Sequence, residues 1–143
     1  MAPPAGKQIR VLCVDDNHLI ADAIHNNLQM VGGFDWAGQL SSADHLLGEV
    51  RQRHPDIVLL DIDMPGKDPF EAMSELSRSC PDARVLVLSG HVRQDWIDRA
   101  VDSGAWGYVS KSEGVHTLVS AIRRVARGHF VLGPDVEAEY QRQ

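Results

Sequence analysis

The sequence predicts one α/β domain in which five parallel strands alternate with five helices. Short apolar runs rich in β-branched residues recur along the chain, and each is followed by a longer segment whose apolar residues have helical spacing. The segments between successive runs are too long for hairpins, so the connections are helical crossovers between parallel strands. A chain of 143 residues that is 43% hydrophobic and 24% charged is large enough to form one such domain around a core.

The predicted strands and helices follow one another in regular alternation. The strand runs are 9–14, 34–40, 56–60, 84–88 and 106–109. The apolar residues with helical spacing fall within 20–28, 43–50, 70–80, 96–101 and 115–126. The runs DIVLL and RVLVL show no polar alternation, which is typical of strands buried on both faces. The sequence therefore predicts a doubly wound (βα)5 fold, with helices on both faces of a five-stranded parallel sheet.

Turn-forming residues mark the ends of the predicted helices. Ser41 or Ser42 is the predicted N-cap of the second helix, and that helix should end just before Pro55. Gly104 and Gly128 are suited to left-handed stops of the fourth and fifth helices.

Composition excludes several classes of protein. A formal net charge of −6 argues against a surface that coats nucleic acid. No apolar run has the length of a signal peptide or a membrane span, so we expect a cytoplasmic protein with no membrane partner. The two cysteines lack zinc-site spacing and are too few for a disulfide scaffold, so both should be reduced thiols. We expect a flexible N-terminus at 1–7, the folded domain at 8–130, and a C-terminal tail or linker at 131–143.

Polar side chains follow four of the predicted strands at the point where each strand ends. The carboxyl ends of parallel strands meet at one edge of a sheet, and ligands of such folds bind there, where the strand order reverses. The residues at this edge are Asp15, Asp16, Asp61, Asp63, Ser89 and Lys111.

These residue types together indicate a metal and phosphate site. Clustered carboxylates repel one another and raise one another's pKa unless a cation lies among them. A hard, oxygen-liganded ion such as Mg²⁺ supplies that charge and keeps coordination positions for a phosphate oxygen. The Lys111 ammonium and the Ser89 hydroxyl could bind further phosphate oxygens.

Each of these residues also has a simpler explanation. Asp15 or Asp16 could cap the helix that starts near His18, Asp61 or Ser89 could be a turn residue, and a lysine is most often a solvated surface charge. Independent caps and turns would fall on one edge of the sheet less often than the members of a shared site. The common position therefore favours a ligand site.

The motifs that carry these residues resemble those of the receiver domain of two-component response regulators. The matching segments are VLCVDDN, IVLLDIDMPG, VLVLSG and GYVSK, and the resemblance covers Ile9 to Phe130. It implies the flavodoxin-like strand order 2-1-3-4-5. It also implies that Asp61 is the phosphoacceptor and a ligand of Mg²⁺, that Asp16 binds the ion directly and Asp15 through water, and that the backbone carbonyl of Asp63 completes the protein ligands.

The resemblance further implies a partner and a switch. The phosphoryl donor would be a sensor histidine kinase, and the chain would be a phosphoacceptor that assists its own Mg²⁺-dependent phosphorylation and dephosphorylation rather than an enzyme. Ser89 would turn toward the phosphoryl group and vacate space for the Tyr108 ring, although an aromatic residue in a strand is core about as often as it is a switch. Asp63 and His91 lie where relatives tune the lifetime of the phosphate.

Residues 104–140 resemble most closely the LuxR/FixJ-type subfamily, in which the receiver is joined to a C-terminal helix-turn-helix domain. Residues 131–143 would then begin the linker to an output domain absent from this chain, and DNA would be bound only through that domain. A stand-alone receiver that acts through protein contacts is the alternative. Arg123, Arg124 and Arg127 form a basic edge on the last helix. This edge is either solvated or part of a homodimer, formed on phosphorylation, in which that helix pairs with the first helix or the fifth strand.

Two departures from the family pattern affect local structure. Pro69 stands where relatives have glycine, and proline is well tolerated in the first turn of a helix, so we expect a stiffened start to the third helix. Ser112 stands where many relatives have a proline on a cis bond. Because a cis bond to a non-proline residue costs about 3 kcal/mol, we expect the Lys111–Ser112 bond to be trans.

A different class of protein shares part of the pattern. VLLDIDMPG is similar to the Asp-x-Asp nucleophile motif of haloacid-dehalogenase-type phosphatases, which would make the chain a hydrolase. In those enzymes the motif follows the first strand, whereas here a strand with its own acidic pair precedes it. A receiver used only as a scaffold is disfavoured because the acidic pair, Asp61, Ser89 and Lys111 are all present.

Overall fold

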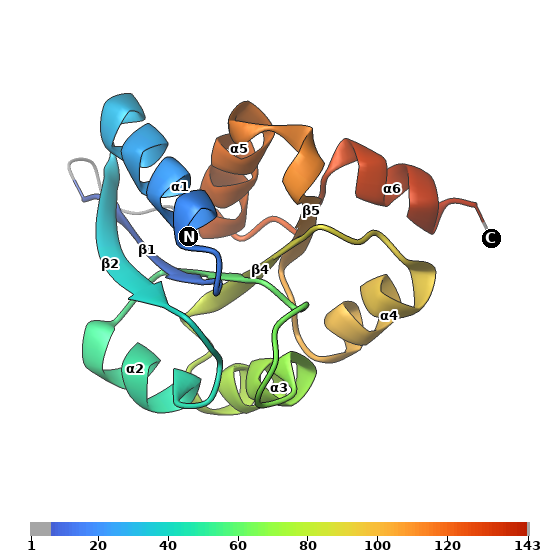
Figure 1. Cartoon of the computed structure of the whole chain (residues 1–143), viewed down its shortest axis with the longest axis horizontal. Coiled ribbons are helices and arrows are strands. Elements are labelled where there is room, and N and C mark those ends of the chain that lie inside the picture. The colour runs from blue at the N-terminus through green and yellow to red at the C-terminus, as the bar shows by residue number, and fades with distance from the viewer. Residues whose placement is uncertain (1–6, 143) are drawn as a thin grey trace.

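Six parallel strands form one sheet in the order β2-β1-β3-β4-β5-β6 in the computed structural model, which describes residues 7–142 (Figure 1). The strands are β1 (Ile9–Val14), β2 (Phe34–Leu40), β3 (Ile57–Leu60), β4 (Arg84–Ser89), β5 (Gly107–Ser110) and β6 (Val131–Leu132). The helices are α1 (His18–Val31), α2 (Leu46–Arg53), α3 (Pro69–Ser79), α4 (Gln94–Asp102), α5 (Val115–Ala126) and α6 (Pro134–Tyr140), with a 3₁₀ turn at Lys111–Glu113. Apart from Lys7, the predicted flexible N-terminus lies outside the described residues.

The predicted five-stranded core is confirmed in its strand order and parallel direction. The structure adds β6, which pairs with the outer edge of β5, and α6, which packs against β5 and α4. Residues 131–143 were expected to form a tail or linker, but Val131–Leu132 and Pro134–Tyr140 form β6 and α6. Two strand residues and a short, mostly polar helix carry too little periodicity for the sequence pattern to show them.

The two faces of the sheet bury different sets of side chains. Residues of β1, β3 and β4 alternate between a cluster shared with α1 and α5 and a cluster shared with α2, α3 and α4. Figure 1 shows α1 and α5 on one side of the sheet, and α2 and α3 on the other. Covering both faces with helices is the arrangement that parallel strands require.

Three predicted helix ends are confirmed, and one predicted cap is wrong. His54, which precedes Pro55, ends α2 with a φ of 52°, and Gly104 and Gly128 follow α4 and α5 with φ of 98° and 92°. Neither Ser41 nor Ser42 caps α2. That helix begins at Leu46 after His45, and the Ser42 hydroxyl instead accepts a hydrogen bond from the Asp44 amide.

The loops that follow β1 and β3 use side chains other than the candidate ligands to start the next helix. Asn17 caps α1 by accepting hydrogen bonds from the Leu19 and Ile20 amides, so neither Asp15 nor Asp16 is used as the cap. Asp68 caps α3, and Pro69 occupies its first turn as predicted.

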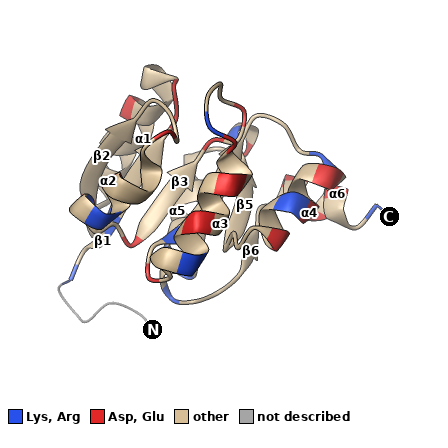
Figure 2. Cartoon of the chain, turned by 90° about the horizontal axis from the view of Figure 1, so that it is seen from below, with Lys and Arg blue, Asp and Glu red and all other residues tan. Residues whose placement is uncertain are grey.

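Charged side chains are distributed over several elements, and both cysteines are unpaired thiols. Lys and Arg are spread over several elements in Figure 2 rather than gathered on one. Cys13 and Cys80 are free thiols, and burial raises the pKa of Cys13 to about 12, which keeps it protonated. Among the described residues no helix has both the length and the apolarity needed to cross a bilayer.

Candidate phosphoacceptor site

Neighbouring strands place two carboxylates side by side at the carboxyl edge of the sheet. Val14 and Leu60 are paired in register, so Asp15 and Asp61 are each the first residue beyond their strand. The Asp61 amide donates to the Val14 carbonyl at 2.9 Å, which extends the ladder by one residue. Asp15 is 1% exposed and Asp61 is 4% exposed, whereas Asp16 faces solvent. Two buried carboxylates at the ends of neighbouring strands require compensation by a positive charge.

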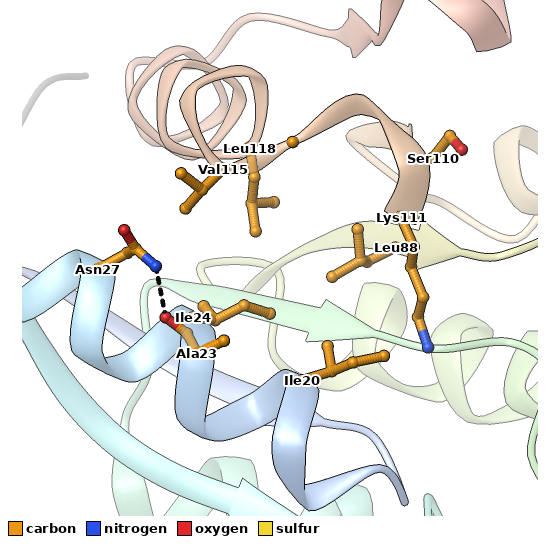
Figure 3. Close-up of a pocket in the computed structure, with 10 residues that line it drawn as sticks. Ile20, Ala23, Ile24, Asn27, Leu88, Ser110, Lys111, Val115 and Leu118 are labelled. Atoms are coloured by element: carbon orange, nitrogen blue, oxygen red, sulfur yellow. Dashed lines mark hydrogen bonds between the residues drawn. The ribbon is translucent and has the colours of Figure 1, made fainter.

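Lys111 supplies part of that charge. It follows β5, two strands away from Asp61, and its Nζ lies 2.8 Å from Asp15 Oδ2 and 3.1 Å from Asp61 Oδ2. Figure 3 shows its side chain extending from the end of β5 past Leu88, at one border of an apolar hollow between α1 and α5. The aliphatic part of the lysine therefore lies along apolar side chains, and the ammonium reaches the acids.

The pKa directions follow from burial and these contacts. Burial raises the pKa of Asp61, although the Asp63 amide and the Lys111 ammonium act in the opposite direction. For Lys111, burial acts to lower the pKa, but contact with Asp15 and Asp61 outweighs it and the net direction is upward. Lys111 is thus a permanent cation at neutral pH.

The acidic residues form a group suited to a divalent cation. One carboxylate oxygen from each of Asp15, Asp16 and Asp61 can be chosen so that all three lie within 4.8 Å of one another. Asp15 Oδ2 is buried, and Lys111 Nζ, 2.8 Å away, is its partner among the described residues. An oxygen of this kind, beside two further carboxylates, fits a hard, oxygen-liganded ion.

Ser89, His91 and Tyr108 form a second connected group beside the acids. The Ser89 side chain is fully buried at the end of β4, and its Oγ accepts a hydrogen bond from the His91 amide at 3.0 Å. The Tyr108 hydroxyl donates to the His91 carbonyl at 2.7 Å, and the residue is only 1% exposed. Burial raises the pKa of Tyr108, so its hydroxyl remains a donor. The expectation from sequence was that the ring enters the interior after Ser89 turns. In this structure the ring is already inside.

The loop after β3 and the loop after β4 meet outside the acids. His91 Nδ1 lies 3.1 Å from Asp63 Oδ2, and both side chains are more than half exposed. The His91 ring also contacts the edge of Trp96 at the start of α4. The two residues named from the sequence as tuning positions are therefore in contact with each other. No observation places the Asp63 carbonyl as a ligand, which stays a prediction.

Comparison with known proteins decides the family. The family described as the response regulator receiver domain matches residues 11–123. The chain belongs to this receiver family. The Asp-x-Asp motif is accordingly that of a receiver, and the haloacid-dehalogenase interpretation is set aside.

Relatives of the receiver include whole response regulators. This chain is 36% identical over 128 residues to the response regulator GacA of Pseudomonas viridiflava, a match that covers 90% of this chain and 60% of the relative. It is 32% identical over 128 residues to the response regulator UvrY of Escherichia coli K12, covering 90% of this chain and 59% of the relative. The chain thus spans less than two thirds of the length of these curated relatives.

Solved structures agree with this fold. A two-component response regulator of the LuxR family from Aurantimonas superposes with a TM-score of 0.87 at 27% identity, covering 94% of this chain and 96% of that one. The receiver domain of the response regulator NarL from Mycobacterium tuberculosis gives a TM-score of 0.80 at 27% identity, covering 86% and 99%.

One residue near the receiver site was not singled out from the sequence. Glu113 closes the 3₁₀ turn after Lys111, and its Oε1 accepts a hydrogen bond from the Ser110 amide at 2.7 Å in a capping box. The Ser-x-x-Glu spacing of SKSE was the signal that could have revealed it. Its Oε2 accepts a hydrogen bond from the Asp135 amide at 3.1 Å, a contact that no local pattern indicates.

The raised pKa of Asp61 predicts a pH-dependent effect of Asp61→Asn on stability in EDTA. Asp61 holds its proton more tightly in the folded chain than in the unfolded one. Its contribution to stability is therefore fully present below its ordinary pKa of 3.8 and is lost as pH rises through the raised value. Asparagine has no charge to bury, so the variant's advantage over wild type should grow with pH across that window and then level off.

Urea unfolding measured from about pH 4 to about pH 7.5 would follow this difference. Asp98→Asn, at an exposed position of α4, is the matched control, and its stability relative to wild type should show no such trend. An Asp61→Asn protein that is less stable than wild type at neutral pH would contradict the prediction.

Proposed function

We propose that Asp61 accepts a phosphoryl group from a sensor histidine kinase and that the resulting change in packing controls an output. The observation that carries this proposal is the contact of one ammonium, that of Lys111, with two buried carboxylates, those of Asp15 and Asp61. A nucleophilic carboxylate beside a fixed cation is what in-line phosphoryl transfer requires.

The proposed step is an in-line displacement. A carboxylate oxygen of Asp61 attacks the phosphorus of a phosphohistidine, a P–O bond forms, and the P–N bond breaks. The electron pair leaves with the imidazole nitrogen, which takes up a proton. Lys111, already 3.1 Å from Asp61, would bind one phosphoryl oxygen as a point charge.

Mg²⁺ is the proposed cation of the acidic group. Asp15, Asp16, Asp61 and the carbonyl of Asp63 would hold it, and when bound it would neutralise charge on the phosphoryl oxygens. Ser89, at the end of the strand next to β3, would donate its hydroxyl to another phosphoryl oxygen. Tyr108 would be held inside by the same rearrangement.

We further propose that the output is transcriptional and that the protein acts in the cytoplasm. Support comes from the relatives, GacA and UvrY, which are response regulators longer than this chain, and from a LuxR-family structure of the same fold. DNA would be bound by a C-terminal helix-turn-helix domain outside these 143 residues rather than by the receiver.

Incubation with acetyl phosphate and Mg²⁺ should add one phosphoryl group, detected by intact mass. The gain should be absent in Asp61→Asn and in EDTA, since the first removes the nucleophile and the second the cation. Lys111→Met should slow the gain roughly a hundredfold, because a preorganised charge in the transition state is lost.

Lys67→Met is the matched control, because that lysine lies in the neighbouring loop but pairs with Glu75. It should be phosphorylated at the wild-type rate. A phosphoryl gain that persists in Asp61→Asn would contradict the assignment of the acceptor. Continuous turnover of a phosphomonoester would indicate a hydrolase instead.

We propose that Asp63 and His91 together set the lifetime of the phosphate. Their contact joins two loops beside Asp61 and would limit the approach of water. Asp63→Asn and His91→Ala should each speed the loss of the phosphoryl group about 1.5- to 5-fold, the range expected for breaking one partly exposed side-chain contact. Decay of the added mass after removal of acetyl phosphate measures this.

Asp95→Asn breaks another exposed pair, with Arg93, and serves as the control. Its decay rate should equal that of wild type. Unchanged decay in both Asp63→Asn and His91→Ala would rule out the proposed role.

We also propose a homodimer of the phosphorylated receiver through α1 and α5. Strand β5, the other partner considered from sequence, has its outer edge paired with β6. Arg124 and Arg127 are exposed, the first on α5 and the second just after it.

Sedimentation equilibrium in the presence of acetyl phosphate should show a dimer for wild type and a monomer for Arg124→Glu. Arg78→Glu on α3 is the control and should dimerise like wild type. A monomer mass that does not depend on concentration in the phosphorylated protein would count against the dimer.

A further inference from the structure

The C-terminal segment, defined as residues 131–140, is bound through its backbone to β5 and the residue before it. The Val131 amide donates to the Trp106 carbonyl and the Gly133 amide donates to the Tyr108 carbonyl, both at 3.0 Å. The second bond ends on Tyr108 itself. Any movement of the Tyr108 backbone therefore acts directly on this segment.

Side-chain packing ties the same segment to the Tyr108 ring. Val136 of α6 is fully buried, and it belongs to one cluster of buried side chains with Tyr108 and with Ile97 and Ala100 of α4. Figure 1 shows α6 at the β5 end of the sheet, near α4. The inward ring thus belongs to the same buried cluster as Val136, and α6 packs against β5, the strand that carries the ring. Departure of the ring would leave a cavity in this cluster, which is costly in a packed core.

Glu113 makes a third connection to the C-terminal segment, from the 3₁₀ turn that contains Lys111. Its Oε1 accepts from the Ser110 amide at 2.7 Å, and its Oε2 accepts from the Asp135 amide at 3.1 Å. Gly133 passes so close that an added Cβ would lie 2.4 Å from Oε1. One carboxylate therefore joins the residue before Lys111 to the start of α6.

We propose that the C-terminal segment docks on the receiver only when the Tyr108 ring is inside, so that phosphorylation of Asp61 strengthens its docking. This inference rests on the proposed function for its phosphorylation step. The docked segment and the inward ring contribute side chains to one buried cluster, and Lys111 and Glu113 connect the segment to the acceptor. Because binding free energies are reciprocal, loss of docking should in turn weaken the phosphorylated state.

Hydrogen exchange of the Val131 and Gly133 amides, followed by NMR in the 143-residue chain, reads docking directly. Exchange should slow at least about fivefold with acetyl phosphate and Mg²⁺, the lower end of typical coupling between sites. Intact mass of the same sample gives the phosphorylated fraction. Unchanged or faster exchange in a fully phosphorylated sample would overturn the inference while leaving the proposed function standing.

Matched valine variants separate docking from general destabilisation. Val136→Ala should speed exchange of both amides at least about fivefold without phosphate. Val101→Ala makes the same chemical change at an exposed position of α4 and should exchange both amides at the wild-type rate. Equal exchange at Val131 and Gly133 in the two variants would overturn the inference.

A third variant tests the ring without any phosphate. Tyr108→Ala should speed exchange of the Val131 and Gly133 amides beyond the change at the Leu28 amide in α1, which reports global opening. An equal change at all three amides would show that docking does not depend on the ring and would overturn the inference. If intact mass shows no phosphorylation at all, the proposed function fails and this variant still decides the docking claim.

Discussion

The contact of Lys111 with Asp15 and Asp61 is the interaction on which the rest of the site depends. Two carboxylates that are almost wholly buried cannot both ionise side by side without a cation, and an unpaired buried charge is strongly destabilising. The lysine directly follows a third strand, β5. Strands β1, β3 and β5 must therefore be aligned before the ammonium can compensate the charge of the two carboxylates. Three carboxylates and one ammonium leave two negative charges at this edge, which a divalent cation would balance.

The same edge of the sheet carries the connections by which a change at Asp61 could spread. Ser89 lies at the end of β4, and the backbone of His91 accepts from Tyr108 and donates to Ser89. Tyr108 lies in β5, whose outer edge pairs with β6 of the C-terminal segment. The buried hydroxyl and the aromatic ring are thus linked by short hydrogen bonds through the His91 backbone, and two packings of one ring would be sufficient for a switch.

Much of the fold and many of the site residues could be predicted from the sequence because they depend on local sequence pattern. Alternation of apolar runs and helical segments predicted the five-stranded core, and the residue after each strand predicted which side chains gather at its edge. The cap of α2 was missed because Ser42 bonds to the Asp44 amide within its own turn, and His45 precedes the helix without a side-chain bond. β6 and α6 were missed because Val136 is the only buried residue of α6 and gives no periodic signal.

By itself the sequence determined the fold class, the receiver motifs and the set of acids, hydroxyl and lysine at the carboxyl edge, because these follow from residue type and spacing along the chain. The tertiary structure alone decided that Lys111 contacts both buried acids, that His91 pairs with Asp63, that the Tyr108 ring lies inside, and that Glu113 holds the C-terminal segment. Each of these is a distance between groups on segments far apart in the sequence or a choice of side-chain rotamer. Such distances are set by how the helices and strands pack, which no local pattern records.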